Sequence, residues 1–128
     1  MKLVAIIPLG LLFFTACKKV EGEGGSGSIT GKINIQDYNT NQTVLLSEYP
    51  GAKEDVYIIY GTGDNTFDDK IEASYDGSFE FKYLEPGTYT IFAYSDCLTC
   101  NGGEEAIKAT ITVDKKKATD VGTITLKK

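Results

Sequence analysis

Apolar and polar side chains alternate with a period of two along most of the chain from Ser28 onward. The stretch SFEFKYL, for example, places Phe79, Phe81 and Tyr83 on one face and charged residues on the other. No convincing 3.6-residue helical period appears in this region. The pattern therefore predicts seven short strands, at residues 28–38, 55–61, 68–77, 78–84, 86–95, 104–113 and 120–128.

Seven strands at this spacing predict one all-β domain over residues 28–128, a seven-stranded immunoglobulin/prealbumin-like sandwich. Residues 55–61 are almost continuously apolar, as in a central strand that is covered on both faces. The connection over residues 38–54 holds three apolar residues, Val44–Leu46, which could form an extra edge strand or a surface tuck. The predicted core includes Phe79, Phe81, Leu84, Tyr89 and Ile91.

The first sixteen residues do not follow the strand pattern. Lys2 is followed by twelve uncharged residues, 3–14, whereas a helix that spans a bilayer needs about 20 apolar residues. A charged start, a short apolar run and small residues before a cleavage site are typical of a secretory signal peptide. We therefore predict a signal peptide over residues 1–16, with a buried N-terminal strand or helix as the alternative.

The sequence FTAC at residues 14–17 resembles the lipobox of bacterial lipoproteins. The resemblance implies that Cys17 is acylated and becomes the first mature residue. The protein would then lie in the cell envelope, lipid-anchored to a membrane, with the outer membrane of a Gram-negative bacterium as the expected one. Residues 17–27 are rich in Gly, Ser, Lys and Glu, a composition that predicts a flexible tether.

Residues 74–96 contain a recurring pattern of turns and aromatic residues: Asp76-Gly77, Phe79, Phe81, Leu84, Pro86-Gly87 and Tyr89. Asp-Gly supplies the positive φ of a tight hairpin turn, and Pro-Gly is typical of a type II turn. This segment resembles the carboxypeptidase-regulatory-like and Cna-B-like group of prealbumin-type sandwiches. This resemblance implies an architecture and no reaction. Residues 56–77 further resemble small single-domain lipoproteins of the same sandwich group, which implies an exported lipoprotein with this fold.

The composition narrows the range of functions. The chain has no His, Arg or Trp, and its net charge is −5. A nucleic-acid partner would require a basic surface, and the usual nucleophile–base pairs require a histidine, so we expect neither nucleic-acid binding nor an enzyme. The leading prediction is a non-catalytic interaction or structural accessory module. The alternative is a small carbohydrate- or peptide-binding surface lipoprotein, which an exposed aromatic patch would favour.

Cys97 and Cys100 form the motif CLTC between two predicted strands. In an exported protein such a pair is expected to form a disulfide that pins the tip of the hairpin. Free thiols remain an alternative. A redox-active pair would need its first thiol at a helix N-terminus, and the following residues lead into a strand. A zinc site would need two further ligands, and the chain has no histidine to supply one.

An acidic loop offers Asp64, Asn65, Asp68 and Asp69 as candidate calcium ligands, because Ca²⁺ takes six to eight oxygen atoms. It departs from an EF-hand, since Asp69 stands at the glycine position. A solvated, charged turn is the alternative, and no other cofactor is expected. The tyrosines could be exposed for binding a glycan or protein partner, but most are predicted to lie in the core; these are Tyr57, Tyr60, Tyr75, Tyr83, Tyr89 and Tyr94.

Overall fold

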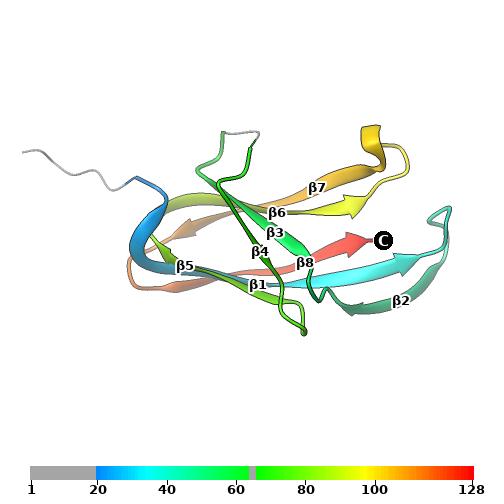
Figure 1. Cartoon of the computed structure of the whole chain (residues 1–128), viewed down its shortest axis with the longest axis horizontal. Coiled ribbons are helices and arrows are strands. Elements are labelled where there is room, and N and C mark those ends of the chain that lie inside the picture. Colours follow the sequence, from blue (N-terminus) through cyan, green and yellow to red (C-terminus); the bar gives the residue numbers. More distant parts are fainter. Residues whose placement is uncertain (1–19, 64–65) are drawn as a thin grey trace, which may run out of the picture.

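The computed structural model describes residues 20–63 and 66–128, which form two packed β-sheets (Figure 1). Sheet A contains β1 (Glu23–Tyr38), β2 (Leu45–Pro50), β5 (Ser78–Leu84) and β8 (Ala118–Lys127). Sheet B contains β3 (Asp55–Tyr60), β4 (Asp69–Glu72), β6 (Gly87–Asp96) and β7 (Glu104–Val113). The all-β, sandwich-like architecture is as predicted. In the described part of the chain the strands number eight rather than seven, and the one helical element is the short 3₁₀ turn η1 (Asn101–Gly103).

β1 organises sheet A because it pairs along both of its edges. On one edge, β5 pairs antiparallel with the first part of β1 and β2 pairs antiparallel with the last part. On the other edge, β8 runs parallel to β1, with Ile33 opposite Ile124. The first and last strands of the described fold are therefore neighbours. Sheet B is antiparallel throughout, in the order β4-β3-β6-β7, so β3 is a central strand.

The eighth strand is β2, which lies in the connection where an extra edge strand was one of two predicted outcomes. The loop before it is closed by Asn39, whose Oδ1 accepts hydrogen bonds from the amides of Thr43 and Val44 at 2.8 and 3.0 Å. All six residues of β2 are exposed. An edge strand that is exposed on both faces has no alternation of burial, so its sequence carries little period-two signal.

β1 begins at Glu23, five residues before the predicted start, so the second half of the predicted tether belongs to sheet A. The amide of Gly22 donates a hydrogen bond to Tyr89 Oη at 2.9 Å. Gly25 lies so close to the neighbouring strand that a Cβ atom there would collide with the carbonyl oxygen of Leu84. The glycines that predicted flexibility thus allow two backbones to approach closely.

The space between the sheets is filled by the predicted core. Phe79, Phe81, Leu84, Tyr89 and Ile91 are all at most 5% exposed, which confirms their assignment. They pack with residues from both sheets, among them Ile29, Ile33, Ile35, Val56, Ile58, Ala93, Val113, Ile124 and Leu126. Burial of this apolar surface is the main term that holds the two layers together.

One side chain of β5 was assigned to the wrong face. Tyr83 was predicted to share the face of Phe79 and Phe81, but it is 70% exposed, and Leu84 is buried instead. The reason is a local irregularity: Tyr83 has a φ of 60°, and the register of β1 shifts opposite Leu84. A positive φ at a non-glycine residue breaks the regular alternation of side chains, so simple counting along the strand fails there.

The two glycine turns join strands of different sheets, and neither is a hairpin turn. Asp76-Gly77 lies between β4 and β5, with Gly77 at φ 81°. Gly87 has a φ of 154°, so Pro86-Gly87 does not form the predicted type II turn. The corner is closed instead by Tyr89, whose Oη donates a hydrogen bond to the carbonyl oxygen of Glu85 at 2.6 Å. This is the tyrosine corner seen in many β-sandwiches.

The predicted signal peptide and the predicted lipidation residue Cys17 lie outside the described residues. Within residues 20–63 and 66–128, the structure contains no helix with the length and apolar character needed to cross a bilayer.

Candidate functional site

The outward face of sheet B carries an apolar layer of its own. Tyr57 on β3 lies opposite Phe92 on β6, and both point away from the core because Ile58 and Ile91, the next pair along the strands, point into it. Phe92 is only 5% exposed, yet it is not part of the core between the sheets. Something on the outer face must therefore cover it.

Tyr57 and Tyr94 contact the ring of Phe92, and Phe67 packs on Tyr57. We call Tyr57, Phe67, Phe92 and Tyr94 the aromatic cluster. Tyr57 lies at its centre: its ring stacks on Phe92 with a centroid separation of 4.9 Å and an interplanar angle of 10°. Phe67 and Tyr94 meet Tyr57 edge to face, at 4.8 and 5.4 Å. Phe92 and Tyr94 also meet edge to face, at 5.6 Å. Both geometries are the favourable ones for aromatic pairs.

The aromatic cluster exposes part of its rings to solvent. Phe67 is 49% exposed and Tyr94 is 39% exposed, whereas Tyr57 is partly buried. None of the five main cavities of the described part of the chain, from about 190 to about 480 Å³, is lined by any of the four rings. The cluster is thus an open platform that lies outside these five cavities.

Charged groups of both signs surround this platform. Partial burial, followed by the charges of Asp55, Tyr94 and Glu104, raises the pKa of the Tyr57 hydroxyl. Asp55 lies two residues before Tyr57 on the same strand and therefore shares its face. On the neighbouring strands, Lys70 lies opposite Tyr57 and Lys108 lies opposite Phe92. The rings are therefore flanked by hydrogen-bond acceptors and donors.

The acidic loop delivers Phe67 to the aromatic cluster. Asp68 Oδ2 accepts a hydrogen bond from the amide of Tyr60 at 2.7 Å, and the amide of Asp68 donates one to the carbonyl oxygen of Ile58 at 2.8 Å. Asp69 Oδ1 accepts a hydrogen bond from the amide of Lys70. Asp68 therefore fixes the loop to β3. The other two proposed calcium ligands, Asp64 and Asn65, lie outside the described residues, so the calcium site stays a prediction.

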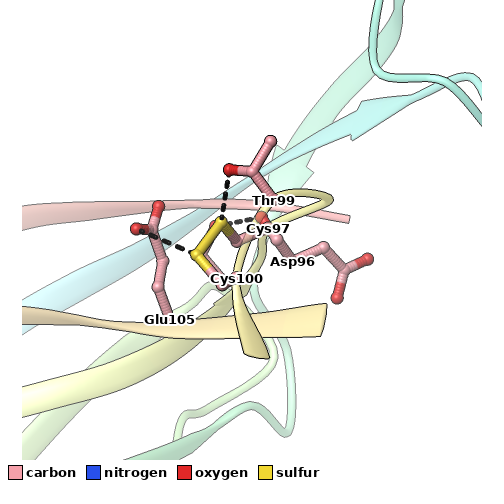
Figure 2. The surroundings of a disulfide bond; sticks show 6 residues. Asp96, Cys97, Thr99, Cys100 and Glu105 are labelled. Atoms are coloured by element: carbon pink, nitrogen blue, oxygen red, sulfur yellow. Dashed lines mark hydrogen bonds between the residues drawn. A yellow bond between two sulfur atoms is a disulfide. The ribbon is translucent and has the colours of Figure 1, made fainter. Parts of the chain in front are cut away.

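Cys97 and Cys100 are joined by a disulfide at the tip between β6 and β7, with their Cα atoms 5.3 Å apart (Figure 2). The amide of Cys97 donates a hydrogen bond to the carbonyl oxygen of Gly103 at 2.8 Å, across the loop. Glu105 comes from the first residues of β7, and its Oε2 lies 3.9 Å from Cys100 Sγ. Figure 2 shows this carboxylate directed at the sulfur.

The outward positions of β1 in sheet A are polar. Glu48 Oε1 accepts hydrogen bonds from Asn34 Nδ2 at 2.9 Å and Gln36 Nε2 at 3.1 Å, and these bonds lower the pKa of Glu48. A cavity of about 480 Å³ opens on the same face. Its lining includes Thr30, Lys32, Ser78, Glu80, Asp120 and Thr123.

The prediction that most tyrosines lie in the core is correct for Tyr89, which is fully buried, and for Tyr60, which packs against the core. It is wrong for Tyr75, Tyr83 and Tyr94, which are 89%, 70% and 39% exposed, and for Tyr57, which lies half-buried on the outward face of sheet B. The alternation of side chains along a strand could have located part of the aromatic cluster, because Tyr57, Phe92 and Tyr94 alternate with core residues on β3 and β6. No signal of this kind identifies Phe67, which comes from a loop.

Comparison with known proteins shows the fold alone. No protein-family model matches the chain, and no curated protein matches it in sequence. One similar solved structure is a Pseudomonas aeruginosa protein described as a proposed carbohydrate binding protein, with a TM-score of 0.51 and 13% sequence identity. The match covers 84% of this chain and 91% of that one.

Proposed function

We propose that this protein binds carbohydrate through the aromatic cluster on sheet B. The observation that carries the proposal is the group of four contacting rings, of which Phe67 and Tyr94 expose about half and two fifths of their surface. Exposed apolar patches on a soluble domain mark binding surfaces more often than chance. The fold neighbour described as a proposed carbohydrate binding protein supports the same reading.

The chemistry of the platform suits a sugar. One face of a pyranose ring presents C–H groups that stack on an aromatic ring, while its hydroxyl groups project around the rim. The exposed rings of Phe67 and Tyr94 supply the stacking surface, and Asp55, Glu104 and Lys108 supply acceptors and donors at its border. An open platform contacts several units of a chain at once, so an extended polysaccharide is a better ligand than a free monosaccharide.

The proposal includes no catalysis and places the protein in the cell envelope. The absence of histidine from the sequence removes the commonest general base. The resemblance of residues 14–17 to a lipobox supports a lipid anchor at Cys17. Mass spectrometry of membrane-extracted protein tests this part: a lipid-modified peptide that starts at Cys17 is expected, and mature protein that retains Met1 would overturn it.

A polysaccharide-binding assay tests the proposed function directly. Purified protein is run through gels that contain soluble polysaccharides, incubated with insoluble ones, and applied to a glycan array. The test variants are Tyr94→Ala and Phe67→Ala. Tyr75→Ala is the matched control, since Tyr75 is 89% exposed and belongs to none of the ring contacts of the described residues.

The test variants should lose about fivefold or more in affinity, because stacking of one aromatic ring contributes on the order of 1 kcal/mol or more. The control should bind like the unmodified protein. If a polysaccharide in the gel slows the migration of all three variants as much as that of the unmodified protein, the binding surface lies elsewhere. Absence of binding to every polysaccharide tested would overturn the proposal itself.

An accessory role that depends on a protein partner is the second candidate, and β2 is the observation that favours it. Leu45, Leu46 and Tyr49 are 44%, 63% and 46% exposed on this edge strand. Exposed apolar edge strands are prone to pair with another chain. Cross-linking in intact cells should capture a partner that is lost in Leu46→Lys. Retention of the same partner by that variant would count against this role.

A further inference from the structure

The disulfide tip brings together three groups that can ligate a metal ion once the disulfide is open. Cys97 Sγ, Cys100 Sγ and a carboxylate oxygen of Glu105 all lie within 4.8 Å of one another. Sequence spacing alone offers only the two thiols. The third group is contributed by β7, which folds back against β6 and places Glu105 beside the sulfurs (Figure 2).

The separations of these groups fit a tetrahedral metal centre. With Zn–S bonds of about 2.3 Å and Zn–O bonds of about 2.0–2.2 Å, two sulfur ligands lie about 3.8 Å apart and a sulfur and an oxygen about 3.5 Å apart. Cys100 Sγ and Glu105 Oε2 are already 3.9 Å apart. The two Cα atoms are separated by 5.3 Å, so rotation of the cysteine side chains can part the sulfurs.

The loop holds its shape through its backbone as well as through the disulfide. The amide of Cys97 donates a hydrogen bond to the carbonyl oxygen of Gly103. The amide of Gly103 donates one to the carbonyl oxygen of Cys100 at 3.0 Å, and the amide of Cys100 donates one to the carbonyl oxygen of Cys97 at 3.3 Å. Opening a disulfide between residues three apart releases little loop entropy, because that term grows with loop length. The reduced tip therefore keeps both cysteines and Glu105 near their present positions.

The surroundings are acidic and open. Asp96 lines the same groove of about 450 Å³ as Cys97 and Glu105. Lys127 is the one cation in the lining of this groove. Nearby carboxylates favour a bound cation through their charge. An exposed rim leaves the fourth coordination position to water.

We propose that the reduced tip is a binding site for a thiophilic divalent cation such as Zn²⁺, with Cys97, Cys100 and Glu105 as its protein ligands. A dithiol or phosphine reductant donates two electrons to the sulfur–sulfur bond, and two protons complete the thiols. Zn²⁺ then displaces these two protons as it binds the thiolates. A disulfide oxidant accepts two electrons from the thiolates and leaves as two thiols, which re-forms the Cys97–Cys100 bond and releases the ion, so the disulfide closes the site.

The test uses Co²⁺ as a spectroscopic probe, because a cobalt–thiolate bond gives a charge-transfer absorption that other ligands do not. All proteins carry Cys17→Ser, so that Cys97 and Cys100 are the only thiols. Protein reduced with a phosphine under argon should bind one Co²⁺ per chain with this absorption, and Zn²⁺ should displace it. The oxidised protein and the reduced Cys100→Ser variant should give no such absorption.

Two variants separate ligation from general charge. Glu105→Gln should weaken binding about tenfold or more, as expected when a ligand or its close partner is removed. Glu104→Gln removes the same charge from the neighbouring residue and should change the affinity by less than about twofold. Equal losses in the two variants would show that Glu105 is no ligand. Absence of the thiolate absorption, in reduced protein whose circular dichroism remains native, would overturn the site as a whole.

Discussion

The two outward faces of the sandwich follow the same strand geometry and carry opposite kinds of side chain. On sheet A the outward positions of β1 are polar and include Lys32, Asn34 and Gln36. On sheet B the outward positions of β3 and β6 hold Tyr57, Phe92 and Tyr94. The face of sheet A therefore meets water with its polar groups bonded to one another, whereas the face of sheet B meets water with stacked rings.

The difference between the two outward faces shows which apolar surfaces the sandwich fold requires. Both inward faces must be apolar, because they bury each other. A polar outward face is compatible with a stable sheet, as the outward positions of β1 in sheet A illustrate. The aromatic cluster thus exceeds what a sandwich architecture requires, and its partly exposed rings are the basis of the proposed binding surface.

The largest expected contrast is in stability. Phe92→Ala should lower the free energy of unfolding by about 3 kcal/mol, because a nearly buried ring and its two ring contacts are lost. Asn34→Ala, on the other outward face, should change it by no more than about 0.5 kcal/mol. Urea denaturation followed by circular dichroism measures both. Similar losses in the two variants would remove the distinction between the faces.

Pairwise coupling gives a smaller contrast. A double-mutant cycle on Tyr57 and Phe92 should yield about 1 kcal/mol of favourable interaction, since stacked rings interact beyond their buried area. The same cycle on Asn34 and Glu48, whose hydrogen bond is exposed to water, should yield a smaller coupling than the two rings. A coupling near zero for the two rings would mean that their contact is incidental.

The two faces should also differ in their response to pH. Burial raises the pKa of Tyr57, so its contribution to stability is present below the ordinary tyrosine pKa of about 10 and is lost as the pH rises above it. Hydrogen bonds from Asn34 and Gln36 lower the pKa of Glu48, so its contribution is present above the ordinary glutamate value of about 4.3 and is lost as the pH falls.

Unfolding curves at several pH values measure this difference. Tyr57→Phe should reduce the loss of stability above pH 10, although not remove it, because the pKa values of Tyr60 and Tyr89 are also raised by burial. Glu48→Gln should reduce the loss of stability at acidic pH and leave the dependence of stability on pH above 10 unchanged. If Tyr57→Phe and the unmodified protein lose the same stability above pH 10, the partial burial of the Tyr57 hydroxyl is contradicted.

The smallest effect is expected for the surface ion pair of sheet A. Lys82 Nζ lies 3.9 Å from Glu80 Oε1, and both side chains are well exposed. Lys82→Ala should change the free energy of unfolding by less than about 0.5 kcal/mol, and added salt should not alter that result. A loss above 1 kcal/mol would show that this polar face contributes more to stability than its exposed geometry suggests.

The sequence by itself determined the all-β class, the approximate positions of seven strands and the five core residues tested. These properties follow from local alternation and from turn residues, which act within a few positions along the chain. Sequence also placed Cys97 and Cys100 between two strands, where the structure joins them. It did not locate Glu105 beside them, because that contact depends on how β7 folds back on β6.

Only the tertiary structure decided which glycines are rigid, which tyrosines are exposed and where the aromatic cluster lies. Gly25 is glycine because another backbone lies against it, and nothing in the neighbouring sequence reports that approach. Tyr89 and Tyr94 lie on the same strand, yet one closes a buried corner and the other faces water. The cluster needs β3 and β6 in register and a loop that returns Phe67 to them. Such contacts join residues far apart in the chain, so local patterns cannot specify them.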